Sequence, residues 1–232
     1  MLRHTAITAF LIGLLSACAN TSSDTVTGPS KGSKDGKDSI AGDSLDAFTA
    51  GLIGIWATAC QPIPNNDTAW VRYEFRYNEK QFINRTLTYK EKECTSIYRD
   101  VIVHHTYVVG DSVDHSPVPN THEINWVFLK TELAIYQDAL IATYNQNNGY
   151  GYSDWQPGIY KEVGGRAYTP DTAVIPHEPG KVVYSIIAYD EQFLVDGDFT
   201  TGDGDSPLTR PRDVRTKFPF FRKNNPLQNG YN

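Results

Sequence analysis

The sequence offers few of the residue patterns that carry out catalysis. Hydrolases often place a nucleophilic serine on a G-x-S-x-G elbow between a strand and a helix, metalloproteases use H-E-x-x-H, and nucleotide enzymes cradle phosphate in a glycine-rich loop. The 232-residue chain contains no serine elbow between an expected strand and an expected helix, no H-E-x-x-H and no such phosphate loop. We therefore predict that the protein is not an enzyme and that it needs no cofactor.

Two of the six histidines are adjacent, at positions 104 and 105, within a run of alternating residues. Successive residues of a strand point to opposite faces, so His104 and His105 cannot hold one metal ion as neighbouring ligands. His105 falls on the face of Val103 and Tyr107. It is either a hydrogen-bonded interior histidine or a ligand contact, and both alternatives stay open here.

Two further groups of residues could bind a metal ion. One consists of His115, His122 and His177, which fall in expected loops, together with two aspartates at positions 111 and 114. The other is the segment 196–205, where four aspartates alternate with glycines, because hard cations take oxygen ligands from flexible loops. That segment lacks the glutamate that closes a twelve-residue calcium loop. We predict exposed loop histidines, a polar hairpin turn and no metal site, with calcium at 196–205 as the open alternative.

The N-terminal residues have the pattern of a secretory signal. Arg3 supplies positive charge, an apolar run of residues 6–15 follows, and small residues lead to Cys18. The ending Leu15-Ser16-Ala17-Cys18 resembles the lipobox of bacterial lipoproteins. This resemblance implies removal of a signal peptide, residues 1–17, and lipidation of Cys18 by fatty acyl chains such as palmitate. An ordinary cleaved signal is the alternative.

The same resemblance places the protein in a bacterial cell envelope, bound to a membrane through its lipid anchor. Ala19 stands where retention in the inner membrane usually shows aspartate, which favours the outer membrane; the leaflet side stays open. The apolar run is shorter than the roughly 20 residues of a transmembrane helix. A net charge of -6 and the lack of a basic cluster exclude a nucleic-acid partner held through phosphates.

Composition divides the rest of the chain into two parts. Residues 18–48 are rich in Ser, Thr, Gly, Asp and Lys, which cannot bury enough apolar surface to fold, so we predict a disordered tether after the lipidated cysteine. Residues 49–232 form the predicted globular domain. Its two cysteines, Cys60 and Cys94, would lie in an oxidising compartment, so we predict a disulfide, with a zinc pair as the alternative.

The globular domain alternates apolar and polar residues with a period of two, which is typical of half-buried strands. In residues 70–77 one face carries Val71, Tyr73, Phe75 and Tyr77, and a turn at 78–80 leads into a second strand. Asp138 is expected to cap one short helix through Tyr144. Many short strands indicate an all-β, antiparallel barrel or half-barrel. The expected strands cover residues 54–60, 70–77, 82–89, 97–109, 124–129, 132–136, 182–189, 193–199 and 217–222.

The first half of this domain resembles a known family. Gly54-Ile55-Trp56 looks like the G-x-W that opens lipocalin-like barrels, and G-x-W-x-x-x-C through Cys60, then C-T at Cys94, is similar to the APCDDC domain and to lipocalin-like bacterial lipoproteins. The resemblance covers residues 54 to about 107 and departs from the family at Val71. It implies a curled sheet with an apolar interior that holds a lipid-like ligand, and packing of Trp56 against an arginine of the last strand, Arg222.

We therefore expect an envelope lipoprotein whose barrel binds a small apolar or amphipathic, lipid-like ligand. The expected ligand contacts are Tyr73, Phe75, His105, Tyr107 and Trp155. Trp155 belongs to an aromatic-rich segment, residues 149–180, that either forms a lid over a barrel mouth or plugs the end of the sheet. The alternative function is a non-catalytic structural module, or one that binds a protein or glycan of the envelope. Oligomeric state stays open.

Overall fold

The computed structural model describes residues 46–63, 66–114, 116–167 and 176–223. The predicted signal peptide, the lipidation site Cys18 and the predicted tether up to residue 45 lie outside these residues. Side chains at positions 66 and 67 are not described either.

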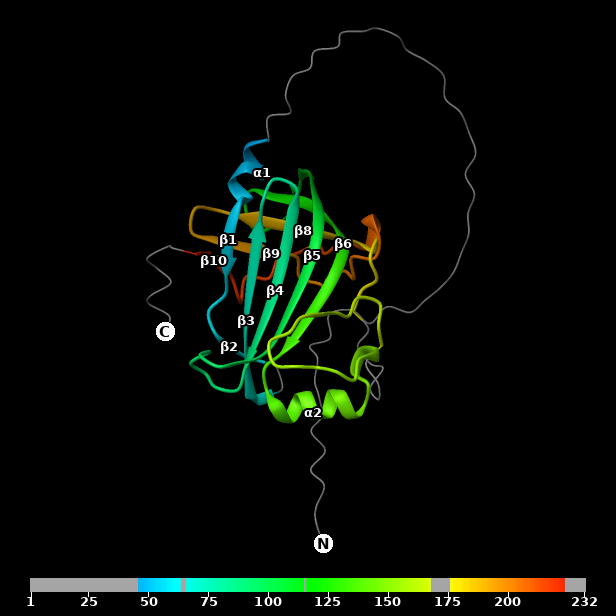
Figure 1. Ribbon diagram of the computed structural model, residues 1–232. Helices are drawn as coiled ribbons and strands as arrows, with labels where there is room; N and C mark the ends of the chain where they lie inside the picture. The colour runs from blue at the N-terminus through cyan, green and yellow to red at the C-terminus, as the bar shows by residue number, and fades with distance from the viewer. Residues whose placement is uncertain (1–45, 64–65, 115, 168–175, 224–232) are drawn as a thin grey trace, which may run out of the picture.

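The described chain is built on a single ten-stranded antiparallel sheet (Figure 1). The strands are β1 Gly54–Ala57, β2 Gln61–Ile63, β3 Asn66–Tyr77, β4 Gln81–Tyr89, β5 Ile97–Ser112, β6 Thr121–Ile135, β7 Lys161–Glu162, β8 Val182–Tyr189, β9 Phe193–Asp196 and β10 Phe220–Arg222. They follow the order β1-β10-β9-β8-β6-β5-β4-β3, and β1 also pairs with β3, which closes an eight-stranded barrel. The predicted all-β barrel is confirmed, in its closed form.

Strand β1 closes the barrel because it pairs on both of its edges. Trp56 lies opposite Arg222 of β10 and opposite Phe75 of β3. The Trp56 side chain is fully buried, and the Arg222 guanidinium lies 4.5 Å from the centre of its ring. The contact that the G-x-W resemblance implied is therefore present. Because β1 pairs on both sides, the barrel strands β1 and β3 do not present the free edge at which an open sheet can pair with another chain.

The sequence predicted two strands, 124–129 and 132–136, where the structure has the single strand β6. A β-bulge explains the error, because His104 and His105 of β5 face Lys130 and Phe128, and Leu129 has no partner. The extra residue shifts the inward-facing positions of β6 from even to odd numbers. In the sequence, this break in the alternation of apolar and polar residues is typical of a turn between two strands, and a turn was therefore predicted.

Two short helices stand at opposite ends of the barrel (Figure 1). The predicted helix is α2, Asp138–Gln146, but Asp138 is its first helical residue and the N-cap is Gln137, whose side chain makes no capping hydrogen bond. Helix α1, Ala47–Leu52, was not predicted and contains the expected boundary between tether and domain. Phe48 is buried, so the folded domain begins before residue 49.

Helix α1 covers one end of the barrel and is held there by side chains of the strands. Its carbonyl groups at Phe48, Gly51 and Leu52 accept hydrogen bonds from Tyr189 Oη, Arg222 Nη2 and Trp56 Nε1, at 2.8, 2.5 and 2.9 Å. These bonds satisfy carbonyls that a short helix leaves without partners. A side chain at Gly51 would overlap the Tyr189 hydroxyl, so the close approach requires glycine.

The opposite end is filled by α2 and the segment that follows it, which includes a short 3-10 turn, Gly149–Gly151. Buried side chains of this segment and α2 pack on the end of β6 and form one cluster, whose members are Leu133, Ile135, Ile141, Tyr144, Tyr150, Trp155 and Val163. Residues 149–180 were expected either to form a lid or to plug the end of the sheet. Tyr150 and Trp155 plug the end of the sheet. Tyr160 lies outside the cluster and is partly exposed, and residues 168–175 are outside the described chain.

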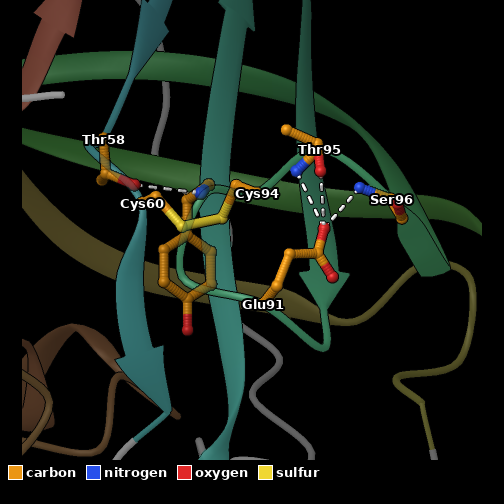
Figure 2. Close-up of a disulfide and its surroundings, with 7 residues drawn as sticks. Thr58, Cys60, Glu91, Cys94, Thr95 and Ser96 are labelled. Atoms are coloured by element: carbon orange, nitrogen blue, oxygen red, sulfur yellow. Dashed lines mark hydrogen bonds between the residues drawn. A yellow bond between two sulfur atoms is a disulfide. The ribbon is translucent and has the colours of Figure 1, made fainter.

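The predicted disulfide between Cys60 and Cys94 is confirmed, and no zinc pair forms there (Figure 2). The two Cα atoms are 6.0 Å apart, within the usual range for a disulfide. Cys94 has a positive φ of 49°, a conformation that costs energy for a residue with a side chain. The Glu91 carboxylate holds the same loop by accepting hydrogen bonds from the backbone nitrogens of Thr95 and Ser96, at 2.9 and 2.5 Å.

Among the residues that the structure describes, no helix has the length and apolar character needed to cross a membrane.

Candidate functional site

The barrel interior contains a cavity of about 190 Å³ whose walls are mostly aromatic rings. The rings come from several strands: Phe75 of β3 lies 3.9 Å from Phe220 of β10 in a stacked arrangement, and Phe82 of β4 stacks on His105 of the neighbouring β5 at 5.0 Å between ring centres. This upper cavity is lined by Tyr73, Phe75, Phe82, Asn84, Val103, His105, Trp126, Phe128, His177, Val183, Asp196, Phe199, Arg215 and Phe220. It is the candidate functional site.

A second interior cavity, of about 170 Å³, adjoins the first on the side of α2. The two share Val103, Phe128 and His177, so they are neighbours along the barrel axis. This lower cavity is lined by Arg99, Val101, Val103, Phe128, Thr131, Leu133, Tyr150, Val163, Pro176 and His177. Together the two cavities reach the lower end of the roughly 300–1,000 Å³ that small-molecule sites occupy.

A larger hollow of about 680 Å³ lies beside α1. Its walls are largely connecting segments, such as residues 118–120 and 190–191, which run over protein surfaces. It holds two acidic residues, Asp190 and Glu191. We assign the functional site to the interior cavities because strand residues form most of their walls and because they combine apolar walls with a few polar groups, as ligand sites do.

One ion pair lies in the wall of the upper cavity. The Arg215 side chain donates to both carboxylate oxygens of Asp196, at 3.1 Å from Nε and 2.5 Å from Nη2, and the Asp196 side chain is 5% exposed. Burial opposes the charge on Arg215, yet the neighbouring Asp196 carboxylate raises the pKa of the guanidinium. The two charges cancel, so the pair adds no net charge to the cavity.

The two cavity histidines are neutral at neutral pH. Burial lowers the pKa of His105 to about 4, and burial together with the positive charge of Lys181 lowers the pKa of His177. His105 is 3% exposed, and its Nδ1 atom has no hydrogen-bond partner among the described residues. Asn84 Oδ1 is also buried without a partner there. The upper cavity is therefore apolar and uncharged overall, with a few polar atoms in its wall.

The lower cavity has one charged lining residue, Arg99, on the inward face of β5 opposite Thr88 and Ile135. The Arg99 Nε atom is buried and has no hydrogen-bond partner, and no described carboxylate forms an ion pair with the Arg99 guanidinium. Arg99 is half-buried, so its charge is removed from water only in part, while its buried Nε lacks the hydrogen bond that burial calls for. Among the described lining residues, Arg99 therefore leaves a net positive charge at the α2 end of the interior.

Three of the five expected ligand contacts, Tyr73, Phe75 and His105, lie in the wall of the upper cavity. The other two line neither cavity. Tyr107 packs edge-on against Tyr77 near the first hairpin and donates a hydrogen bond to the Asn78 carbonyl at 2.7 Å. Trp155 is 2% exposed within the plug at the α2 end, and its Nε1 donates to the carbonyl of residue 149 at 3.1 Å.

The adjacent histidines face opposite sides, as predicted. His105 points inward, whereas His104 Nε2 lies 2.7 Å from Glu132 Oε2 on the outer face. The prediction of exposed loop histidines is wrong for two others: His122 belongs to β6 and packs 3.9 Å from the Phe48 ring, and His177 lines both cavities. His115 lies outside the described residues.

The segment 196–205 is a strand end and a turn. Asp196 ends β9 and pairs with Arg215, Asp198 accepts from the backbone nitrogen of Thr200 at 3.0 Å, and Asp205 pairs with Lys181. Within the described part of the chain, no three His, Cys, Asp or Glu residues gather as metal ligands. The letters G-P-S-K-G at residues 28–32 match a serine-elbow pattern but lie outside the described residues.

Several cavity residues were missed from the sequence. Asn84 and Arg99 occupy inward-facing positions of β4 and β5, and a polar residue in the apolar phase of an alternating strand was the available signal. No comparable signal marked Arg215 or His177, because they come from irregular segments. Phe199 was expected to end the strand 193–199, but β9 already ends at Asp196.

Comparison with known proteins finds no family model that matches this chain and no curated protein with a matching sequence.

Proposed function

We propose that the protein is a bacterial envelope lipoprotein, anchored to a membrane through lipidated Cys18, whose barrel binds a small apolar or amphipathic molecule. The observation that carries the ligand part is the pair of adjoining interior cavities, with aromatic rings in the upper wall. The Trp56–Arg222 contact agrees with a lipocalin-like barrel. Because the aromatic walls offer apolar surface and few charges, binding would rely mainly on burial of apolar ligand surface.

Filling the interior tests ligand binding. Val103 lines both cavities, so we expect Val103→Trp to block the passage between them and weaken binding about tenfold or more. Native mass spectrometry of the full chain should find a copurified small molecule in the wild type and little of it in the variant. Thermal unfolding checks that the larger side chain, which overpacks the wall, leaves the fold intact.

The matched control is Val108→Trp, because Val108 lies on the outer face of the same strand and is 63% exposed. This variant should retain the molecule. A wild-type protein that carries no small molecule and takes up none from an added lipid extract would overturn the proposal.

The membrane anchor requires a separate test. We expect Cys18→Ser to move the protein from the membrane fraction to the soluble fraction, because a single serine offers no site for the acyl chains that hold the protein on lipid. Thr21→Ser, close by in the sequence, should remain in the membrane fraction. Membrane partition that is unchanged in the Cys18 variant would contradict lipidation.

An interaction module is the second candidate function. Three exposed apolar side chains, Tyr136, Ile159 and Tyr160, lie at the α2 end, with 38%, 53% and 37% of their surface accessible. The Tyr160 hydroxyl donates to the buried Asp100 carboxylate at 2.5 Å, which fixes the ring. A fixed aromatic patch of this kind suits a protein or glycan partner. An empty wild-type barrel in the mass-spectrometry experiment would favour this candidate.

A further inference from the structure

The two cavities lie in series along β5, which provides a scale for the length of a ligand. The inward-facing residues of this strand are Arg99, Val101, Val103 and His105 in order, the first three in the lower cavity and the last two in the upper. At about 3.4 Å per residue, the distance along the strand from Arg99 to His105 is about 20 Å. The site is therefore elongated, and Arg99, the one charged group among its described lining residues that has no ion-pair partner there, lies at one end.

The charges around the two cavities determine which sign of charge a ligand should carry. Asp196 is the sole carboxylate among their described lining residues, and Arg215 neutralises it. His105 and His177 have lowered pKa values because they are buried, and so are uncharged at neutral pH. The positive charge of Arg99 has no ion-pair partner among the described residues, and a bound anion would compensate it.

The residues of the cavity walls indicate the chemistry of the remaining, uncharged part of the ligand. Between Arg99 and the aromatic cavity most of the lining is apolar and offers surface to a chain, as at Val101, Val103, Leu133 and Phe128. Beyond them lie the stacked rings of Phe82 and His105. A molecule that matches this order has an anionic head and a single long apolar tail.

Resting on the proposed function, we infer that the barrel binds a single-chain anionic amphiphile with its head on the Arg99 guanidinium and its tail along Val103 into the aromatic cavity. A carboxylate and a phosphate share the chemistry that an arginine recognises, because both accept paired hydrogen bonds from its fork of N–H groups.

The test measures the affinity of the full chain for three ligands with the same tail: dodecanoate, dodecyl phosphate and dodecanol. Every protein in this test carries Cys18→Ser, so that it can be purified without detergent, and the chain with no further change is the wild type of the comparison. Equilibrium dialysis with radiolabelled ligands gives each affinity. We expect the wild type to bind the anions about 10- to 100-fold more tightly than the alcohol, the range for a hydrogen bond to a charged group. The ratio between dodecanoate and dodecyl phosphate distinguishes the two head groups.

Arg99→Gln should remove this preference by weakening anion binding to the level of dodecanol, while dodecanol binding stays unchanged. Arg99→Lys keeps the charge and should retain most of the preference. Arg212→Gln is the matched control, because Arg212 is exposed and lines neither cavity, and it should behave as the wild type.

Two results would overturn the inference and leave the proposed function standing: equal affinity of the wild type for anion and alcohol, or an undiminished preference in Arg99→Gln. A wild type that binds none of the three ligands, and carries no copurified molecule, would overturn the proposed function and this inference with it.

Discussion

Replacing Cys60 and Cys94 together with serine is expected to lower the free energy of unfolding by about 4 kcal/mol, according to the loop-entropy model of disulfides. The bond joins residues 34 positions apart, so its loss frees a long loop in the unfolded chain. It also leaves the positive φ of Cys94 to be held by the Glu91 hydrogen bonds alone. Urea unfolding followed by circular dichroism measures the change.

Reduction supplies the control for this prediction. Dithiothreitol should destabilise the wild type by a similar amount and should leave the double serine variant unchanged. If the double variant unfolded at the wild-type urea concentration, the disulfide would contribute nothing to the stability of the barrel.

Acid is expected to destabilise the barrel through His105. Its folded-state pKa is about 4, below the roughly 6.5 of a solvated histidine, because burial disfavours the charged ring. Between pH 6.5 and 4 the unfolded chain takes up a proton that the folded chain does not, so stability falls as the pH falls. The loss across this window is about 3 kcal/mol, and the contribution is fully present above pH 6.5.

The measurement is the free energy of unfolding between pH 7.5 and 4 in the wild type and in His105→Phe, which keeps a ring against Phe82 and cannot titrate. The variant should lose most of the pH dependence in this window, apart from a remainder due to His177, whose pKa is also lowered by burial. Val108→Phe, at an exposed position of the same strand, keeps His105 and is the control; it should be as acid-sensitive as the wild type. Equal slopes in wild type and His105→Phe would contradict the neutral buried state.

The barrel could be predicted from the sequence because its signals are local. The alternation in residues 70–77 defines a face for each residue without any knowledge of the rest of the chain, and the structure keeps Tyr73, Phe75 and Tyr77 on the inward face of β3. The error at β6 has the opposite cause. The bulge at Leu129 depends on the register against His104 and His105, and register is a property of two strands.

The candidate site could be predicted only in part, because some of its residues lie on regular strands and others do not. Tyr73, Phe75 and His105 lie on regular strands whose phase is readable. The Asp196–Arg215 pair joins a strand end to an irregular segment, so no periodicity connects the two residues. Trp155 belongs to a long segment whose path is set by packing on Ile141 and Leu133, which sequence patterns do not reveal.

Helix α1 and strand β1 place the start of the described chain directly at the seam that closes the barrel. Tension applied at Asp46 while the opposite end is held by a partner would first break the three bonds to the α1 carbonyls. It would then pull β1 lengthwise between β3 and β10. Because both ladders of β1 would be sheared at once and not peeled bond by bond, the seam would resist force far better than a four-residue strand at a free edge. Force applied on the N-terminal side would thus detach helix α1 from one end of the barrel before it separated β1 from its neighbouring strands.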